Sequence, residues 1–415
     1  MTTPDQDPAL EAEVERQMAE LRRGATQIVS EEGLRARIAR SVRTGRPLRV
    51  KLGVDPTAHD LHLGFTLPLR KLQVFSELGH QPVLIIGDAT AMVGDPSGRN
   101  KARPQLTREM VDDYAASYLR QASKVLDLER VEVRRNSEWL GELGFSGMIG
   151  LVGHATVAQL LVREDFAKRY REGTPIYLHE FVYPLLQGWD SVVVRADVEL
   201  GGQDQLFNLL IGRDLQEAEG QEAQICMMGP LLVGLDGSRK MSKSFGNSIG
   251  LDEAPGEMFG KVMSLPDELM RPWFELATTL PLDEIEAIFA AGSHPRDLKD
   301  RLGREIVERF HDEAAAQGAS DEFRRIFTEQ QLPSEIEELP VPADALDAEG
   351  RIWIVALLRL AGFVTSNGEG MRLVSQGGIK IEGEAVGDPK AEVTFEDGAV
   401  LRAGKKRFVR LRRPE

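Results

Sequence analysis

The sequence predicts an α/β protein in which a parallel sheet wrapped by helices is followed by an α-helical domain and a small α+β domain. Three observations carry this prediction. Short apolar runs alternate with helical patterns up to about residue 230, which is typical of a parallel sheet. From Asp252 to Thr328 the pattern is helical without a strand candidate. A segment of prolines and acids, Leu332 to Glu349, then precedes short alternating strands.

The elements follow from periodicity and from turn residues. Residues 9–43 are predicted to form two helices, interrupted near Gly24, that act as a brace or a lid. Strands are predicted at 48–52, 83–86, 131–133, 192–198 and 223–228, and helices at 64–78, 107–126, 203–217, 351–361 and 367–376. The predicted domains are N-terminal helices (1–45), a sheet domain (46–235) with an insertion near 110–185, a helical domain (236–330), a linker (331–350) and the α+β domain (351–415).

Composition indicates a soluble globular protein. The chain has 415 residues, of which 42% are hydrophobic and 28% charged. No uncharged apolar run reaches the roughly 18 residues that span a bilayer. The first residues are acidic and carry no base before the first apolar stretch, so neither a secretory signal nor a transit peptide is predicted, and the cytoplasm is the expected location. Cys226 lies in an apolar run and is predicted to be a buried thiol.

Charge is distributed unevenly along the chain. The net charge is −15, yet residues 351–415 hold 12 Lys and Arg against 8 Asp and Glu, which gives +4 there and −19 in the rest. The stretch 401–413 has seven bases and no acid. Local clusters of this kind matter for phosphate binding more than the total charge.

A basic segment, RKMSKS at 239–244, follows a glycine-rich turn just after the last predicted strand. Lys240 and Lys243, with hydroxyl residues beside them, suit a polyphosphate, because ammonium groups neutralise charge on a leaving pyrophosphate. A solvated basic turn is the alternative for a looser KxxSK string. The full KMSKS string, however, resembles the signature of the class I aminoacyl-tRNA synthetases.

The partner signature of that class lies where the first sheet strand turns into a helix. Here the chain reads GVDPT at 53–57 and HLGF at 62–65. Gly64 at a helix start lets ATP phosphate approach backbone N–H groups, and His62 is placed to donate to a phosphate oxygen, although a histidine opening a helix is often structural. Phe65 stands where the class has a second histidine, so one donor to the triphosphate is missing. Arg99, Arg103, Lys240 and Lys243 are expected to compensate.

Three further blocks resemble the bacterial tyrosyl-tRNA synthetases, and the resemblance then covers Lys51 to Arg413. The first block is GDPSG at 94–98. The resemblance implies that Asp95 holds the α-amino group of tyrosine and that Arg99 and Arg103 lie on a loop over the pyrophosphate. An acid for an ammonium and bases for phosphates agree with this chemistry. By itself, DPSG is an ordinary turn.

The second block is YPLLQGWD at 183–190. Tyr183, Gln187 and Asp190 share one helical face, a pattern that many amphipathic helices show. The resemblance implies that Tyr183 and Gln187 meet the α-amino end of tyrosine while Asp190 accepts from its phenol. A buried acceptor rejects phenylalanine, because without the hydroxyl it is left unpaired. Many family members have a tyrosine where Lys51 stands, as a second partner of the phenol, so Lys51 is a further candidate.

The third block is GGQDQ at 201–205, in which glycines allow close approach of a nucleoside and Asp204 suits ribose hydroxyls. Gln203 replaces a small residue of the family. The candidate sites are catalytic His62, Thr57, Arg99, Arg103, Lys240 and Lys243; tyrosine-binding Lys51, Asp95, Tyr183, Gln187 and Asp190; and ATP-binding Gly53, Asp55, Gly64, Gly202, Asp204, Gln205, Met241 and Ser242.

Residues 366–410 resemble the RNA-binding fold first described in the fourth protein of the small ribosomal subunit. Arg372, Lys380, Lys405, Lys406 and Arg407 are the predicted phosphate contacts, which would bind RNA by its shape. A merely solvated basic tail is the alternative.

The resemblance implies a Rossmann-like tyrosine–tRNA ligase that uses ATP with Mg²⁺, has no prosthetic group and forms a homodimer through a segment near 135–170. Residues 252–328 and the tail are expected to bind tRNA(Tyr). No metal site is predicted, because no cysteine or third histidine lies near His59 and His62 in sequence. Two alternatives remain open. One is a related tryptophan-activating enzyme, against which Asp190 and the basic tail argue; the other is a non-catalytic RNA-binding protein, against which the other matched site residues argue.

Overall fold

The computed structural model describes residues 7–97, 106–329, 331–333, 336–404 and 407–414. The chain forms two compact units, Met1–Phe310 and His311–Glu415. Arg99, Arg103, Lys405 and Lys406 lie outside the described residues. None of the helices in the described part combines the length and apolar character needed to cross a lipid bilayer.

The centre of the first unit, within its described residues, is a six-stranded sheet with the order β1-β6-β5-β2-β3-β4. β2 pairs in parallel with β3 and β5, β3 with β4, and β5 with β6, whereas β1 is antiparallel to β6. The strands are β1 (Gln27–Val29), β2 (Arg49–Val54), β3 (Gln81–Ile86), β4 (Glu132–Arg135), β5 (Val198–Gly202) and β6 (Ile225–Gly229). The apolar runs of β3 and β6 are buried almost throughout, as expected of parallel strands covered on both faces.

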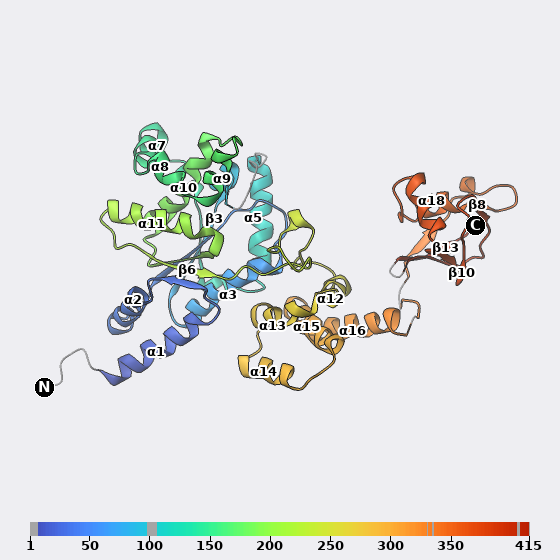
Figure 1. The fold of residues 1–415 in the computed structure, drawn as a ribbon, viewed down its shortest axis with the longest axis horizontal. Helices are drawn as coiled ribbons and strands as arrows, with labels where there is room; N and C mark the ends of the chain where they lie inside the picture. The colour runs from blue at the N-terminus through green and yellow to red at the C-terminus, as the bar shows by residue number, and fades with distance from the viewer. Residues whose placement is uncertain (1–6, 98–105, 330, 334–335, 405–406, 415) are drawn as a thin grey trace. The chain divides into compact units, whose positions relative to one another are not determined.

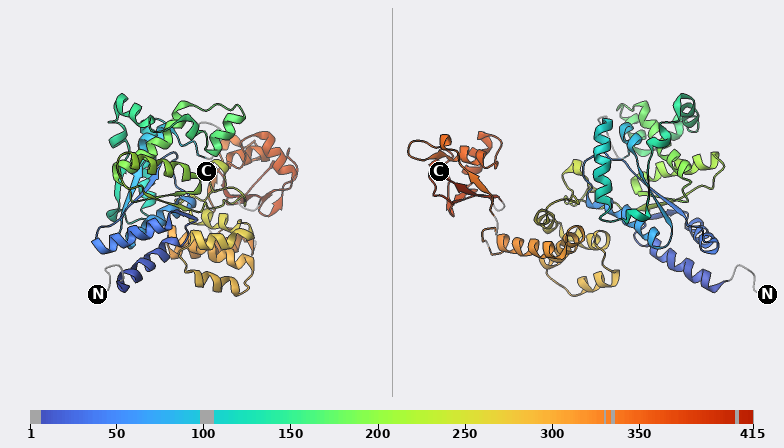
Figure 2. Two further views of the ribbon diagram at one scale, coloured as in Figure 1. Left: turned by 60° about the vertical axis from the view of Figure 1, so that its left-hand side comes forward. Right: turned by 180° about the vertical axis from the view of Figure 1, so that it is seen from behind.

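Helices cover both faces of this sheet (Figures 1 and 2). α3 leads from β2 to β3, and α11 leads from β5 to β6 in the opposite direction along the sheet, so right-handed crossovers place them on opposite faces. The helices are α1 (Pro8–Arg22), α2 (Glu31–Thr44), α3 (Leu63–Glu77), α4 (Asp88–Val93), α5 (Arg108–Ala122), α6 (Ser137–Leu140), α7 (Gly144–Val152), α8 (Val157–Leu160), α9 (Glu164–Arg171), α10 (Leu178–Val194) and α11 (Leu206–Ala218).

The direction of the chain along the sheet reverses between β2 and β5. Ligands of open α/β sheets bind at such a switch point, outside the carboxyl ends of the strands. The carboxyl ends of these two neighbours are Val54 and Gly202. The fold therefore brings the segments after residues 54 and 202 to the edge where a nucleotide is expected.

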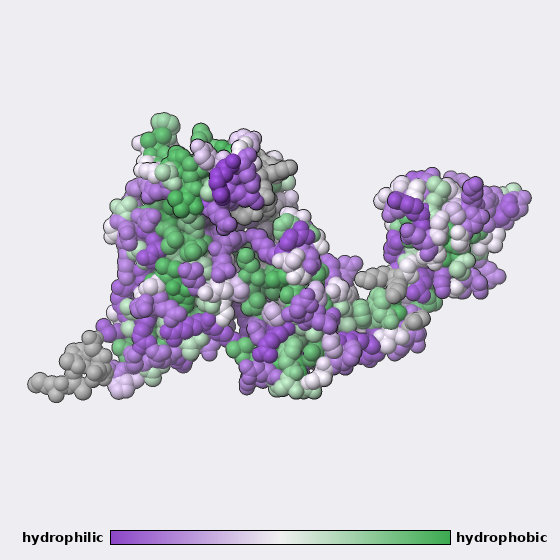
Figure 3. Space-filling model, in the orientation of Figure 1, coloured by the Kyte–Doolittle hydropathy of each residue, from purple (hydrophilic) through white to green (hydrophobic). Residues whose placement is uncertain are grey.

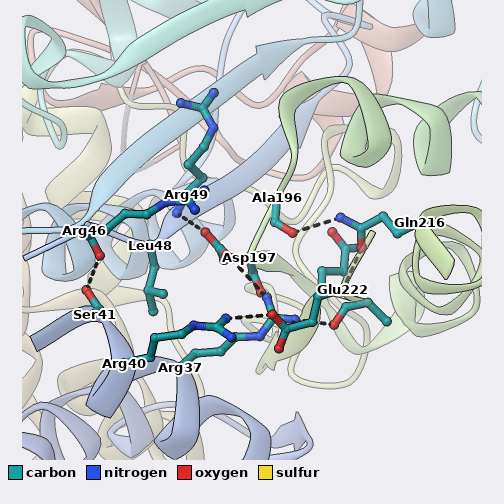
Figure 4. A network of polar contacts seen from close by, with 12 residues as sticks. Arg37, Arg40, Ser41, Arg46, Leu48, Arg49, Ala196, Asp197, Gln216 and Glu222 are labelled. Atoms are coloured by element: carbon teal, nitrogen blue, oxygen red, sulfur yellow. Dashed lines mark hydrogen bonds and ion pairs between the residues drawn. The ribbon is translucent and has the colours of Figure 1, made fainter. Parts of the chain in front are cut away.

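The N-terminal helices are fastened to the opposite, amino end of the same two strands (Figure 4). Arg37 of α2 is buried and donates to the backbone carbonyls of Asp197 at 2.7 Å and Ala223 at 2.6 Å. The carboxylate of Asp197 accepts the backbone N–H of Arg49 at 2.9 Å. This cluster holds α2, β2 and β5 in one arrangement without touching the carboxyl edge.

The helical part of the first unit consists of α12 (Pro255–Met263), α13 (Met270–Ala277), α14 (Leu282–Ala290) and α15 (Pro295–Phe310). α12 packs closely on α15, because Gly303 faces the ring of Phe259, where an added Cβ would lie only 2.8 Å from the ring. The prediction that 252–328 is helical without strands is confirmed for its described residues.

The second unit contains α16 (Glu313–Phe327) and a strand-rich part around a core that includes Ile354, Leu357, Val374 and Leu401. Its larger sheet has the order β10-β9-β12-β13-β7 and its smaller sheet pairs β8 with β11. The elements are β7 (Glu338–Pro340), β8 (Ile352–Trp353), α17 (Ile354–Leu360), α18 (Asn367–Ser375), β9 (Ile379–Ile381), β10 (Glu384–Ala385), β11 (Glu392–Val393), β12 (Val400–Ala403) and β13 (Arg407–Arg412).

Several predicted elements differ from the structure. The predicted helix 351–361 begins only at Ile354, because Ile352–Trp353 form β8, which pairs with β11. The predicted strand 192–198 is wrong at its start, because Val192 and Val194 end the buried face of α10 and β5 begins only at Val198. The segment 331–350, predicted as a linker, contributes β7, which pairs in parallel with β13, and Val341, which is 1% exposed in the core. Prolines there break the pattern of a helix but are tolerated in an edge strand.

Candidate active site

His62 opens α3 at the carboxyl edge of the sheet. Its Nδ1 accepts the backbone N–H of Gly64 at 3.2 Å, which places the proton of the neutral ring on Nε2. Burial, together with the charges of Lys243 and Lys240, lowers the pKa of His62 to about 4. The ring is therefore neutral at physiological pH, with one N–H to donate.

The KMSKS segment lies over the first turn of α3. A Cβ added at Gly64 would lie 3.0 Å from the His62 ring and 3.7 Å from Cβ of Met241. Met241 is buried and its backbone N–H donates to the carbonyl of Leu232 at 2.7 Å. The backbone N–H of Ser242 donates to Oδ1 of Asn247 at 2.8 Å. The fold thus brings together the two signature segments, which are far apart in sequence.

Both signature lysines are bound to carboxylates of neighbouring loops. Nζ of Lys240 lies 2.5 Å from Oδ2 of Asp204, and Nζ of Lys243 lies 2.7 Å from Oδ2 of Asp60. Asp204 follows β5 and Asp60 precedes α3, so the two ion pairs tie the segment to both sides of the switch point. Anionic phosphates would compete with these carboxylates for the lysines.

Asp55 follows β2 and accepts two side-chain hydrogen bonds. Its Oδ2 accepts from the hydroxyl of Tyr183 at 2.9 Å and its Oδ1 from the hydroxyl of Thr90 at 2.8 Å. Residues predicted for the ATP and tyrosine halves of the site are thereby in direct contact. Gly53, the penultimate residue of β2, is exposed, and an added Cβ there would meet no atom within 4 Å. Thr57 lies half-buried in the following loop.

Asp190 is buried on α10, with two donors aimed at its carboxylate. Nε1 of Trp139 lies 2.9 Å from Oδ1, and Nδ2 of Asn136 lies 3.2 Å from Oδ2. Burial raises the pKa of Asp190 to about 7, against the effect of Lys51 and of these two hydrogen bonds. Asn136 also donates to Thr90 at 2.9 Å, which links Asp190 to the residues around Asp55. A carboxylate oxygen accepts more than one hydrogen bond, so this group is suited to accept a hydroxyl as well.

Asp95 joins the three blocks of the sequence in one network. Its Oδ1 accepts the backbone N–H of Ser97 at 2.8 Å, and its Oδ2 accepts Nε2 of Gln205 at 3.0 Å. Nδ2 of Asn208 donates to Oε1 of Gln205 at 2.9 Å and to Oε1 of Gln187 at 3.1 Å. Gln205, predicted to bind ATP, thus contacts the residue predicted to hold the α-amino group.

Lys51 is fully buried and its ammonium makes three polar contacts. Nζ lies 2.7 Å from Oγ of Ser191, 2.8 Å from the carbonyl of Gln187 and 2.9 Å from Oε1 of Glu199. An ammonium has three protons, so every donor of Lys51 is used. The predicted contact with a phenol would have to replace one of these three.

The side chains around Gly202, the last residue of β5, leave little room for a larger residue. A Cβ there would lie 2.8 Å from Oδ1 of Asp204 and 2.9 Å from the Leu231 side chain. No group of three His, Cys, Asp or Glu residues lies close enough to hold a metal ion in the described part of the chain. His59 instead contacts Asp60, with Nδ1 and Oδ1 2.8 Å apart.

In the second unit, Arg372, Lys380 and Arg407 are all exposed. Arg372 is in the last turn of α18, and Lys380 on β9 is the cross-strand neighbour of Arg402 on β12. The guanidinium of Arg407 lies 5.4 Å from the ring centroid of Phe363. The described side chains thus present several cations on this unit, as a phosphate-binding surface requires.

Comparison with known proteins decides the family. Residues 43–328 match the family model described as tRNA synthetases class I (W and Y). The chain is 52% identical over 406 residues to a protein of Moorella thermoacetica named tyrosine–tRNA ligase, with 97% of each chain covered. It is 50% identical to tyrosine–tRNA ligase 2 of Vibrio parahaemolyticus, over 96% of this chain and 99% of the relative. The chain belongs to the class I tyrosyl-tRNA synthetases.

Solved structures of tyrosyl-tRNA synthetases share the fold. The mitochondrial enzyme of Aspergillus nidulans, truncated at its C-terminus, superposes with a TM-score of 0.62 at 23% identity, covering 77% of this chain and 99% of that one. The enzyme of Archaeoglobus fulgidus, solved in complex with L-tyrosine, gives 0.60 at 22% identity, with 74% and 99% covered. The prediction of the fold class is confirmed.

Several residues that contact the candidate site residues were not predicted. Asn136 directly follows β4, where a polar residue at the carboxyl end of a parallel strand was a usable signal, and Trp139 lies in the next helix, α6. Glu199 is an acid inside an apolar strand, which was a second signal. Thr90 belongs to α4, a helix too short to show a period, so sequence patterns held no indication of its place.

Proposed function

We propose that this synthetase activates tyrosine with ATP at the carboxyl edge of its sheet and then esterifies the 3′ end of tRNA(Tyr). In the first step a carboxylate oxygen of tyrosine attacks the α-phosphorus of ATP, and the bond to the β-phosphate oxygen breaks to release pyrophosphate. The terminal ribose hydroxyl of the tRNA then displaces AMP from tyrosyl-adenylate. The observation that carries the proposal is the meeting of His62, Lys240 and Asp204 at the switch point.

Tyrosine is proposed to lie along α10. Asp190 accepts the phenolic hydroxyl, supported by its burial and by Trp139 and Asn136, which hold the carboxylate from the other side. Asp95, Tyr183 and Gln187 face the α-amino end. The network from Asp95 through Gln205 and Asn208 to Gln187 supports this role, since it presents acceptor oxygens together.

ATP is proposed to lie on the loops after β2 and β5. Gly53, Asp55, Gly64 and Gly202 shape the backbone against the nucleotide, Asp204 accepts from the ribose, and Met241 and Ser242 close over it. His62 and Thr57 donate to phosphate oxygens, and Lys240, Lys243, Arg99 and Arg103 neutralise the leaving pyrophosphate. The nucleophile is already an anion, so catalysis requires positioning and charge stabilisation rather than a protein base.

Magnesium is proposed to enter with ATP, where it would offset part of the charge of the phosphates. Because charged tRNA supplies protein synthesis, we place the activity in the cytoplasm.

A homodimer is proposed to form through the segment near 135–170. Within the described residues, exposed apolar side chains cluster there, and Figure 3 shows hydrophobic surface over α7 and α8. The members are Phe145 (84% exposed), Ile149 (54%), Val157 (59%) and Val162 (77%). Contiguous apolar surface of this kind marks protein contacts. tRNA is proposed to bind the helical part and Arg372, Lys380, Lys405, Lys406 and Arg407.

Exchange of labelled pyrophosphate into ATP tests the proposal, with tyrosine, phenylalanine and tryptophan supplied separately. We expect exchange with tyrosine alone. Exchange with tryptophan alone would instead identify a tryptophan-activating enzyme. Absence of exchange with all three, together with retained binding of tRNA, would indicate an RNA-binding protein without catalysis.

A further inference from the structure

The strands that meet at the switch point carry a buried ion pair that the proposed reaction does not use. Lys51 on β2 and Glu199 on β5 are direct neighbours in the parallel ladder. Their side chains are 0% and 1% exposed, and Nζ lies 2.9 Å from Oε1. Removing two charges from water costs several kcal/mol for each ion, and apolar replacements are often as stable or more so. Stability alone therefore does not account for the pair.

Both members of the pair hold Gln187, one on its backbone and one on its side chain. Lys51 donates to the Gln187 carbonyl at 2.8 Å, and Oε1 of Glu199 accepts Nε2 of Gln187 at 3.2 Å. Ser191, one turn further along α10, accepts from Lys51 and donates to Oε2 of Glu199 at 2.9 Å. The ion pair thus fixes one face of α10 over two successive turns.

The chemistry of Glu199 sets which end of the Gln187 amide points where. An ionised carboxylate only accepts, so it must face the NH₂ group of the amide. The amide oxygen then faces the other way, where it accepts from Asn208 at 3.1 Å. An ammonium group needs acceptors around it. The orientation imposed by Glu199 therefore offers the α-amino group of the substrate an oxygen rather than an NH₂ group.

We propose that the Lys51–Glu199 ion pair is a positioning element of the tyrosine pocket, which orients the Gln187 amide, with Lys51 itself contacting no substrate atom. The inference rests on the proposed function, because it takes Gln187 as a contact of the α-amino end. Asp190 lies one residue before Ser191. The charge of Lys51 lowers the pKa of Asp190 and the charge of Glu199 raises it, so the two charges partly cancel at the phenol end when both are present.

The test uses Lys51→Met, Glu199→Gln and the double variant in the full-length protein, with KM for tyrosine and for ATP measured by pyrophosphate exchange. A glutamine at 199 offers NH₂ as readily as oxygen, so the Gln187 amide is free to turn its NH₂ group toward the substrate. For Glu199→Gln we expect the tyrosine KM to rise about tenfold to a hundredfold while the ATP KM stays within about twofold.

The double variant separates positioning from folding. It leaves neither position 51 nor position 199 with an unpaired buried charge, so its Tm should return toward that of the wild type, whereas its tyrosine KM should stay raised. Glu199→Asp, which keeps the charge but withdraws the acceptor by one methylene, should also raise the tyrosine KM with little loss of Tm. Arg37→Met is the matched control, because it removes another buried charge, the guanidinium that lies 3.4 Å from the partly buried Asp197 at the far end of the strands. It should lower the Tm without separating the two KM values.

A double variant with recovered Tm and a wild-type tyrosine KM would overturn the inference, as would equal changes of both KM values in the Glu199 variants. Failure of the proposed function is recognised separately, since the wild type would then show no exchange with tyrosine.

Discussion

The ammonium of Lys240 lies 2.5 Å from Oδ2 of Asp204, so two groups proposed to bind opposite ends of ATP are in direct contact. Lys243 and Asp60 repeat the arrangement at 2.7 Å. Partly exposed ion pairs such as these contribute about 1 kcal/mol or less to stability. They therefore hold the KMSKS segment near its working position while leaving both lysines available to a polyphosphate.

Removing either lysine should slow activation without unfolding the protein. Lys240→Ala and Lys243→Ala are expected to lower kcat for pyrophosphate exchange by about 10²-fold or more, because charge on the leaving group is no longer neutralised. The Tm should barely change. Lys261 is the matched control: its pair with Glu253 spans 2.6 Å at similar exposure but lies outside the site, so Lys261→Ala should keep its rate. Normal rates in the first two variants would contradict the assigned roles.

Phe65 offers a gain-of-function test. Its ring lies 4.7 Å from that of His62, at the start of α3, where the family has a second histidine. Phe65→His should raise the activation rate, by about tenfold or more if the added donor reaches the phosphates. Phe65→Leu keeps the site apolar and should bring no gain. A histidine variant no faster than the wild type would show that other cations already supply the lost contact.

Asp190 should make tyrosine use depend on pH. Burial raises its pKa to about 7, and the ionised form is the one that we propose accepts the phenol. We expect kcat/KM for tyrosine to rise between about pH 6 and pH 8 and then level off. Asp190→Asn should flatten that rise. A profile that falls over the same range would mean that the protonated carboxyl donates to the phenol instead.

Asp190 should also make the stability of the fold depend on pH, and this stability should fall as the pH rises. Its pKa is higher in the folded chain than the roughly 3.9 of an unfolded aspartate, so the folded state binds the extra proton. The stabilisation that this proton provides is complete below the pKa of the unfolded chain. It is lost as pH rises through about 7, the pKa in the folded chain. Denaturant titrations give the free energy of unfolding of the wild type and of Asp190→Asn. Across this pH range the free energy of the wild type should fall relative to that of the variant. A difference between the two that does not change with pH would contradict the raised pKa.

The apolar side chains of α7 give a test of assembly. Phe145 is 84% exposed, and Phe145→Asp should turn the expected dimer into a monomer of 46.0 kDa in sedimentation experiments. Leu282→Asp, at a site that is 46% exposed on α14, should leave the mass of the assembly unchanged. A monomeric wild type at micromolar concentration would remove the proposed dimer.

Long periodic elements could be predicted from the sequence. Short elements, and the residues that contact one another in the fold, could not. α3 and β3 begin and end within a few residues of their predicted limits, because α3 carries a helical period and β3 is a continuous apolar run bounded by turn residues. The prediction for the valine run at 192–194 was wrong because β-branched residues favour a strand, whereas Val192 packs in the hydrophobic cluster that includes Leu185 and Leu215 and remains helical. Local propensity gave way to tertiary contacts.

In the candidate site too, some residues could be predicted from the sequence and others could not. Motif residues such as His62 and Asp204 were predictable because their chemistry requires fixed spacing. The partner of Lys51 was not, since Glu199 meets it only through pairing of strands almost 150 residues apart in sequence. Its place was visible only as an unexplained acid in an apolar run.

The short strand β7 has a practical consequence for dissecting this protein. It covers β13, which would otherwise end its sheet with unpaired backbone groups and invite association with other chains. A fragment cut at residue 351 would lose this cover together with Val341, and would be prone to aggregate. Any excised C-terminal fragment should therefore start before Glu337. A fusion partner should also be joined there rather than after the proline-containing segment 331–350.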